Sequence, residues 1–289
     1  MNDNISQNSF TDESDMDIAL HSIPDMVIEG ETVGIAPGIL RILGLKINNV
    51  TMSEILDIIL DSMAKESQLR ICFVNADCGN ISFKNQMYRQ CLLNADLVLA
   101  DGIGFKIAGR MLKQNIRQNV NGTDMFPKLL AGMNDNNKSL YLLGGKQGVA
   151  ADVAAFVEKN FPGVKIAGFH HGYFDEEDEE KIIKEIHDSH PDCLLVAFGV
   201  PKQDLWIEKN LLNTNAKVAV GVGGLFDFFS GRAQRAPQWL RDIGLEWLYR
   251  LIQEPGRMWK RYLVGNALFL WRTFREKCAG SKCAGSKFD

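Results

Sequence analysis

A short apolar run that ends in an acid is the first candidate for chemistry in this sequence. Residues 97–100 read Leu-Val-Leu-Ala, and Asp101 and Gly102 follow at once. A carboxylate at such a position can cap a turn, or it can act as a general base that takes a proton from a bound hydroxyl group. Spacing alone leaves both interpretations open.

Small or polar residues also follow the other apolar runs of the chain. Small residues let a ligand approach the backbone, and the first amides of a following helix favour anionic groups. The polar candidates are Asn75, Asp101, Tyr173, Gln203 and Asp227, and the glycine candidates are Gly102, Gly144 and Gly145. If the runs are parallel strands, these residues share one crevice beyond the carboxyl ends of the sheet.

The elements that must position these residues alternate between strand and helix. Strands are predicted at 42–51, 71–77, 97–102, 138–145, 165–174, 193–203 and 217–231. Helices are predicted at 51–66, 81–95, 103–112, 148–162, 176–191 and 204–213. Short, continuously apolar strands separated by helices predict an α/β fold, with a mostly parallel sheet covered by helices on both faces.

Several familiar site patterns are weak or missing in the chain. The turn YLLGGKQG at residues 141–148 lacks both GxGxxG and a Walker GK[ST], so a plain tight turn and a phosphate contact remain equally open. His170 and His171 have no carboxylate at ligand spacing, and no two cysteines form a CxxC pair, so we expect no metal site. No serine lies in a GxSxG elbow, which argues against a hydrolase of that type.

The chain has 289 residues and a net charge of −4, and this net charge does not suggest a nucleic-acid partner. The charge is distributed unevenly along the sequence. Residues 235–277 carry nine Lys or Arg against four Asp or Glu, together with four of the five tryptophans. Pro237 and Pro255 suit helix starts, which predicts helices near 237–253 and 256–275. Such helices can pack on the sheet with solvated arginines, or they can meet an anionic membrane and a diphosphate.

We therefore divide the chain into four parts. Residues 1–33 form an acidic tail that we expect to be disordered, and residues 34–232 form the α/β core. Residues 233–277 form a basic, tryptophan-rich helical appendage, and residues 278–289, which repeat CAGSK, form a flexible tail. With no signal peptide and no apolar stretch of spanning length, we expect a cytoplasmic protein attached peripherally to the membrane.

A series of ordered motifs resembles the WecG/TagA/CpsF family of bacterial glycosyltransferases from about Ile42 to Phe274. These motifs are LLNADLVLADGIGFKIAGRML, NGTDMFPKLL, YLLGGKQGVA, HHGYF, AFGVPKQDLWI and GVGGLFDFFSGRAQRAPQWLRDIGLEWLYRLIQEPGRMWKRYLVGN. The resemblance implies a Rossmann-like sheet with a C-terminal helical appendage. It also implies transfer of a sugar from a UDP-sugar to a polyprenyl-diphosphate-linked saccharide in the synthesis of surface polysaccharide, capsule or teichoic acid.

The resemblance also implies roles for single residues. Asp101 would be the general base, Asn75 and Gln203 would contact substrate, and Asp227 would help hold the nucleotide. The arginines implied to approach the diphosphate are Arg235, Arg250, Arg257 and Arg261. Three positions depart from the family pattern, namely Phe73, Asn119 and Asp204, and these departures bear on sugar specificity and donor binding.

The expected reaction is a single inverting displacement at the inner face of the cytoplasmic membrane, with arginines and helix N-termini replacing a divalent metal. No cofactor is expected. The alternatives are a non-catalytic, membrane-peripheral nucleotide-sugar binding module and a dinucleotide-dependent oxidoreductase, although the latter would need a GxGxxG motif after its first strand. The sugar, the acceptor and the oligomeric state, including a homo-oligomer, stay open.

Overall fold

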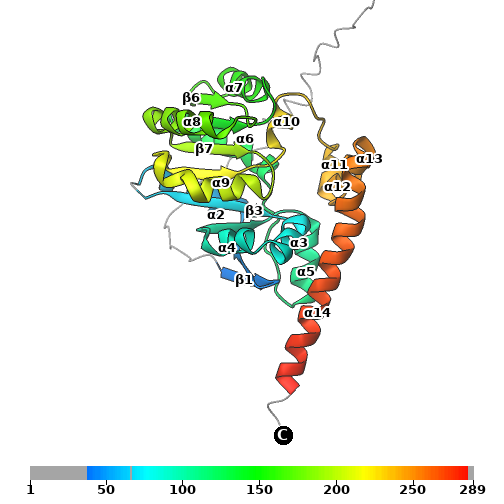
Figure 1. Cartoon of the computed structure of the whole chain (residues 1–289). Helices are drawn as coiled ribbons and strands as arrows, with labels where there is room; N and C mark the ends of the chain where they lie inside the picture. The colour runs from blue at the N-terminus through cyan, green and yellow to red at the C-terminus, as the bar shows by residue number, and fades with distance from the viewer. Residues whose placement is uncertain (1–37, 66, 286–289) are drawn as a thin grey trace, which may run out of the picture. The chain divides into compact units, whose positions relative to one another are not determined.

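A computed structural model describes residues 38–65 and 67–285 and contains a six-stranded parallel sheet (Figure 1). The strands lie in the order β4-β3-β8-β7-β5-β6, and every neighbouring pair is parallel. Their bounds are β3 (Leu69–Val74), β4 (Leu97–Ala100), β5 (Ser139–Gly144), β6 (Lys165–His170), β7 (Cys193–Ala197) and β8 (Val218–Gly221). The predicted α/β, Rossmann-like fold is confirmed. The predicted N-terminal tail, residues 1–33, lies outside the described residues.

Helices cover both faces of the sheet because alternate strand residues point to opposite sides. Ile71 and Phe73 of β3 belong to one buried cluster, and Cys72 and Val74 belong to another. The first face is covered by α2 (Met52–Met63), α6 (Gly122–Asp135), α7 (Val149–Asn160) and α10 (Leu225–Phe229). The second is covered by α3 (Ala76–Lys84), α4 (Gln86–Asn94), α5 (Ile103–Met111), α8 (Glu176–Ser189), α9 (Lys202–Asn210) and the short turn η1 (Leu211–Asn213).

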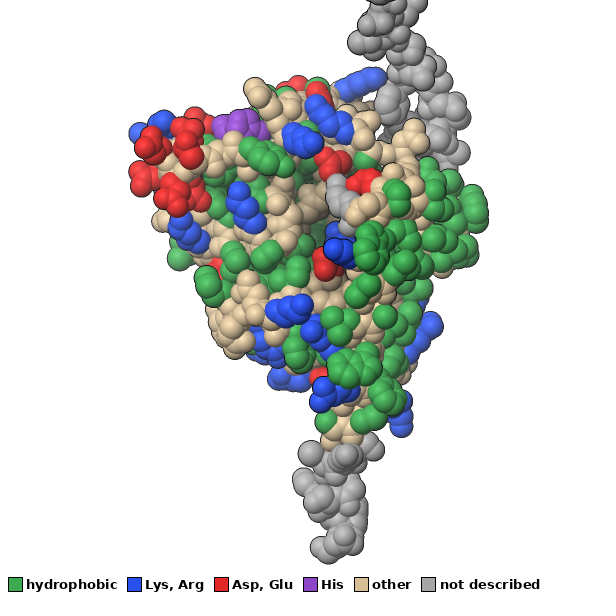
Figure 2. Space-filling model, turned by 45° about the vertical axis from the view of Figure 1, so that its right-hand side comes forward, with side chains coloured by type: hydrophobic (Ala, Val, Ile, Leu, Met, Phe, Trp, Pro, Cys, Tyr) green, Lys and Arg blue, Asp and Glu red, His purple; other side chains and the backbone are tan. Residues whose placement is uncertain are grey.

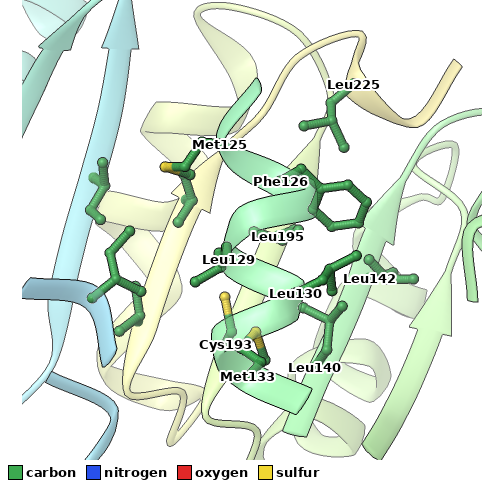
Figure 3. Close-up of a cluster of buried hydrophobic side chains, with 14 of the residues drawn as sticks. Met125, Phe126, Leu129, Leu130, Met133, Leu140, Leu142, Cys193, Leu195 and Leu225 are labelled. Atoms are coloured by element: carbon green, nitrogen blue, oxygen red, sulfur yellow. The ribbon is translucent and has the colours of Figure 1, made fainter. Parts of the chain in front are cut away.

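Helix α6 lies at the centre of the first face, and the sequence did not predict it. Figure 3 shows Phe126 and Leu130 on the side of this helix toward Leu142 of β5, and Met125 on the opposite side. Glycine and proline at Gly122, Pro127 and Gly132 lower its intrinsic helix propensity. Burial of one complete apolar side outweighs that propensity, as it does for most helices in proteins.

The first predicted strand is wrong in its pairing. Residues 42–51 do not join the parallel sheet; β1 (Gly38–Ile42) and β2 (Leu45–Asn49) form a separate antiparallel hairpin. Leu43 and Gly44 both have positive φ, 53° and 71°, which is the geometry of a tight hairpin turn. The Asn48 side chain accepts a hydrogen bond from Val98 N at 2.8 Å, so the hairpin lies beside the edge strand β4.

The appendage consists of shorter helices than the sequence predicted. The predicted helix 237–253 is interrupted by Gly244, whose φ of 76° ends a helix readily. The observed elements are α11 (Gln238–Asp242), α12 (Glu246–Gln253), α13 (Pro255–Trp259), one π-helical turn η2 (Lys260–Val264) and α14 (Gly265–Gly285). Helix α14 therefore continues past residue 278, where we expected a flexible tail to begin.

Phe269 anchors helix α14 to the core. Its ring is fully buried and packs at a tilt against Phe105, with 5.0 Å between the ring centroids. A Cβ on Gly79 would come within 2.7 Å of the Phe269 ring. Asn80 Nδ2 donates to Gly265 O at 2.7 Å, and Arg272 donates to Asn80 Oδ1 at 2.7 Å. The start of the appendage helix is thus part of the folded core, not a free tether.

Replacing Phe269 with alanine is expected to lower the free energy of unfolding by about 3–5 kcal/mol, because it leaves a cavity between α3, α5 and α14. Urea unfolding measures this loss. The matched control is Phe274→Ala on the same helix, which we expect to change stability little because its side chain is 53% exposed. Equal losses in the two variants would contradict the anchoring role of Phe269.

Candidate active site

A cavity of about 250 Å³ lies where the carboxyl ends of β3 and β4 meet the appendage. The core contributes Asn75, Asp77, Asp101, Gly102, Asn121 and Asp124. The appendage contributes Arg241, Glu246, Trp247, Arg250, Arg261 and Tyr262. In the strand order β4-β3-β8-β7-β5-β6, strand β3 lies between β4, the next strand in the sequence, and β8, the last one. The direction of the strand connections therefore reverses at β3, and parallel sheets bind ligands beside such a reversal. The cavity lies near this point.

The turn after β4 holds Asp101 in place. Asp101 N donates to Val74 O at 2.8 Å, which continues the pairing of β4 with β3. Gly102 has φ of 86°, and no atom lies within 4 Å of the position that a Cβ would take. Asn119 Oδ1 accepts from Gly102 N at 2.6 Å. Asn119, one of the three positions that depart from the family pattern, therefore stabilises the turn that carries Asp101.

The pKa of Asp101 is raised to about 7. Burial is the main cause, and the neighbouring carboxylates of Glu246 and Asp124 raise it further, whereas Arg261 and Arg250 oppose the shift. A carboxylate with a pKa near neutral is a stronger base than an ordinary aspartate and is still largely ionised slightly above pH 7. The site therefore has a group suited to accept a proton.

The neighbouring strand end supplies Asn75 and Asp77. Asn75 Oδ1 accepts from Asp77 N at 3.0 Å and from Cys78 N at 3.2 Å, so this oxygen caps helix α3. The NH₂ group of Asn75 is the part of the side chain that remains for a ligand. Asp77 forms an ion pair with Arg261 at 3.2 Å, which joins the core to the π-helical turn of the appendage.

Arg250 differs from the other cavity arginines in its partners. Its guanidinium stacks over the Phe228 ring at 4.9 Å, and no described carboxylate lies within ion-pair distance of it. A Cβ on Gly224 would lie 3.5 Å from Arg250 Nη2 and 3.7 Å from Asp227 Oδ2, so Arg250 and Asp227 approach the same point after β8. Arg250 is therefore available for an anionic ligand.

The other arginines predicted to contact a diphosphate lie differently. Arg261 lines the cavity, but Arg235 is directed to Asp124 at 2.8 Å and to Glu246 at 3.5 Å. Arg257 lies in α13, and the position of its side chain is outside what the structure describes. The cavity therefore brings together two of the four predicted arginines.

The predicted glycines after β5 lie apart from Asp101. A Cβ on Gly144 would meet the backbone of Ala197 at 2.6 Å, and one on Gly145 would meet Val149 at 2.7 Å, so both positions allow close packing. Tyr173, 72% exposed, borders an open hollow of about 360 Å³ with Lys146, Gln147 and His171.

Gln203 is buried between two strand-end loops. Its Oε1 accepts from Gly199 N at 3.2 Å and from Gly223 N at 2.9 Å, and so links the loops after β7 and β8.

Sequence reasoning missed several cavity residues, above all Asp124, Glu246 and Trp247. Helical spacing offers a signal for Glu246, because it precedes Arg250 by four residues and so shares its face of α12. Asp124 lies at the third position of α6, where an acid favours the helix N-terminus. A contact of Asp124 with an arginine 111 residues away has no local signal.

Comparison with known proteins shows the family of the chain. Residues 40–283 match the glycosyl transferase WecG/TagA/CpsF family. The chain belongs to this family. It is similar to the N-acetylglucosaminyldiphosphoundecaprenol N-acetyl-beta-D-mannosaminyltransferase of Bacillus subtilis (strain 168), with 35% identity over 67% of this chain and 74% of that protein. The protein of the same name from Staphylococcus aureus (strain MRSA252) is 31% identical over 82% of this chain and 92% of that protein.

Membership of the WecG/TagA/CpsF family confirms that the chain is a glycosyltransferase. The relatives act, as their names state, on a lipid-linked diphosphate saccharide. Within the described residues of this chain, no helix combines the length and apolar character needed to cross a bilayer.

Proposed function

We propose that the protein transfers an N-acetylhexosamine from a UDP-sugar to an N-acetylglucosaminyl-diphospho-polyprenol, with Asp101 as general base. One observation carries this proposal: a single cavity brings the carboxylate of Asp101 together with Arg250 and Arg261. The names of the relatives in Bacillus subtilis and Staphylococcus aureus support the choice of acceptor and of N-acetylmannosamine as the first sugar to test.

The proposed reaction is one displacement. The acceptor hydroxyl oxygen attacks the anomeric carbon, its proton passes to the carboxylate of Asp101, and the bond to UDP breaks with its electron pair on the diphosphate. The product therefore has the inverted anomeric configuration. Arg250 and Arg261 stabilise the negative charge that develops on the leaving diphosphate, the role that a divalent cation has in many transferases.

Acceptor-dependent release of UDP tests this function directly. Full-length protein is mixed with each of a panel of UDP-sugars, with and without N-acetylglucosaminyl-diphosphate carrying a short, soluble prenyl chain. We expect UDP release that requires the acceptor, with UDP-N-acetylmannosamine the best donor. Binding of UDP-sugars without release under any condition would support a nucleotide-sugar binding module and contradict the proposal.

Activity is expected to persist in EDTA, because the arginines supply the positive charge. UDP release before and after extensive chelation measures this, with magnesium added back as the control. A loss of more than about tenfold that magnesium restores would contradict an arginine-only site.

The appendage also presents an apolar surface suited to a membrane interface (Figure 2). Its exposed apolar residues are Trp239, Ile243, Ile252, Trp259, Leu263, Val264, Trp271 and Phe274. Lys260 lies over the ring of Trp259 at 5.5 Å and Arg275 over that of Trp271 at 5.1 Å, which places cations beside the aromatic rings. This composition supports peripheral docking on anionic lipid.

Either Ile252→Asp or Leu263→Asp is expected to weaken binding to phosphatidylglycerol vesicles by about tenfold or more, since a charge replaces a buried apolar contact. Vesicle sedimentation measures the bound fraction. Leu212→Asp is the matched control, because Leu212 is 84% exposed but lies on the core. If Leu212→Asp weakens binding as much, the appendage surface is not the docking site.

A further inference from the structure

Glu246 is an unexpected residue for the wall of this cavity. It lies on α12 of the appendage and faces a site where we place both a carboxylate base and an anionic substrate. Asp77, Asp101 and Asp124 line the same cavity, so a fourth acid adds repulsion unless it is paired. Its partner therefore indicates what it does.

That partner is Arg235, which connects two carboxylates from different parts of the fold. Arg235 Nη2 lies 2.8 Å from Asp124 Oδ1, and Arg235 Nε lies 3.5 Å from Glu246 Oε1. The Arg235 side chain is 21% exposed, so solvent screens these contacts less than it screens a surface ion pair. Arg235 thus links the start of α6 in the core to the start of α12 in the appendage.

Asp124 is held firmly enough to act as the fixed end of this connection. Asn121 Nδ2 donates to its Oδ2 at 2.6 Å, and Arg241 Nη1 approaches its Oδ1 at 3.4 Å. Burial opposes ionisation of Asp124, but Arg235, Asn121 and Arg241 outweigh burial and hold its pKa below the usual value. The carboxylate therefore stays ionised at neutral pH.

We propose that Asp124, Arg235 and Glu246 form a positioning bridge that holds helix α12 over the cavity, with Arg250 and Trp247 in the same cavity wall as Glu246. The bridge gives Arg235 a positioning role, because it acts through two carboxylates and does not line the cavity. The inference rests on the proposed function only in naming Asp101 as the base; the bridge is a property of the fold.

Seating α12 also changes the surroundings of Asp101. The charged groups that act on it are Glu246 and Arg250 from α12, Arg261 from η2 and Asp124 from α6. Asp77 and Arg241 of α11 line the same cavity. Burial and Glu246 are the two largest causes of the raised pKa of Asp101, and the appendage contributes to both. Displacing α12 exposes Asp101 to water and removes Glu246, and both changes return the carboxylate toward an ordinary, weaker base.

Amide hydrogen exchange of full-length protein without substrate tests the bridge independently of activity. We expect Arg235→Ala and Glu246→Ala each to speed exchange of residues 246–253 about tenfold, and the double variant to add little, because each change breaks the same link. Lys209→Ala is the control, since it breaks a 3.1 Å ion pair with Glu179 on the core. Additive effects, or no change in residues 246–253, would overturn the bridge.

Glu246→Gln separates position from charge. Glutamine keeps the size of the side chain but loses the charge that attracts Arg235 across 3.5 Å, so we expect exchange of residues 246–253 to speed up less than in Glu246→Ala. The acidic limb of the kcat/KM profile should move to lower pH by several tenths of a unit. Arg235→Lys is expected to restore part of the protection lost in Arg235→Ala, because one ammonium group reaches only one carboxylate well.

The two claims fail in different ways. If the wild-type protein transfers no sugar, the proposed function is contradicted, whereas the hydrogen-exchange measurement still tests the bridge. An active wild-type protein whose Glu246→Gln profile does not move would show that Glu246 has no influence on the base. If Glu246→Ala unfolds, the milder Glu246→Gln and Arg235→Lys variants still give both measurements.

Discussion

Replacing Asp101 with asparagine is expected to lower kcat by about 10²–10⁴-fold and to leave the affinity for UDP within about twofold. Asparagine keeps the size of the side chain and cannot accept the proton of the acceptor hydroxyl. Asp101 and Gly102 lie at the cavity, and the turn around them is held by backbone and Asn119 hydrogen bonds that asparagine leaves in place. Steady-state UDP release and calorimetric UDP binding measure the two quantities.

The same substitution is expected to stabilise the protein at alkaline pH. The folded-state pKa of Asp101, about 7, is above the ordinary value, so its contribution to stability is present in acid and is lost as pH rises through about 7. Removing the charge should then raise the free energy of unfolding by about 1–3 kcal/mol near pH 8, with the difference disappearing below about pH 4. Asp57→Asn, at an exposed position on α2, is the control for stability.

Full transfer activity in Asp101→Asn would contradict the role of Asp101 as the general base.

Replacing Arg250 with alanine is expected to lower kcat/KM by about 10²–10³-fold. Arg250 is the cavity arginine without a described carboxylate partner, so its charge is free for the diphosphate. Arg261 already neutralises Asp77 at 3.2 Å, and Arg235 is held by Asp124 and Glu246. Donor and acceptor titrations with a short-chain, soluble acceptor measure the loss without a contribution from membrane binding.

Arg275→Ala is the matched control for Arg250→Ala. Arg275 also belongs to the appendage and also stacks on an aromatic ring, that of Trp271, but it does not line the cavity. We expect the activity of the Arg275→Ala variant on the soluble acceptor to stay within about twofold of wild type. Equal losses in the two variants would show a general effect of appendage charge, not contact with the leaving group.

The parallel sheet was predictable because its strands are covered on both faces and so appear as continuous apolar runs, as at Ile71–Val74 and Leu97–Ala100. The hairpin around Leu43 and Gly44 was missed because its turn lacks the Asn-Gly or Asp-Gly signal. Helix α6 was missed because burial, not propensity, stabilises it. Local patterns therefore predicted the layers but not every element within them.

The candidate site was predictable to the extent that it depends on strand ends. Asn75, Asp101 and Gly102 meet in one cavity because parallel strands end at the same edge. The pairing of Arg235 with Asp124 could not be predicted, because the two residues are 111 positions apart and no local pattern joins them. Composition indicated the basic appendage, and only the folded arrangement distinguishes Arg250 from Arg235.

The pH dependence of single-turnover sugar transfer tests whether Asp101 takes the proton of the acceptor hydroxyl. With donor and short-chain acceptor saturating, rapid quenching measures the chemical step for wild type and for Asp101→Asn. We expect the wild-type rate to rise tenfold per pH unit in acid and to level off once Asp101 is ionised in the substrate complex, and the residual rate of Asp101→Asn to lack this transition. The same transition in both proteins, or a flat wild-type profile, would contradict Asp101 as the base.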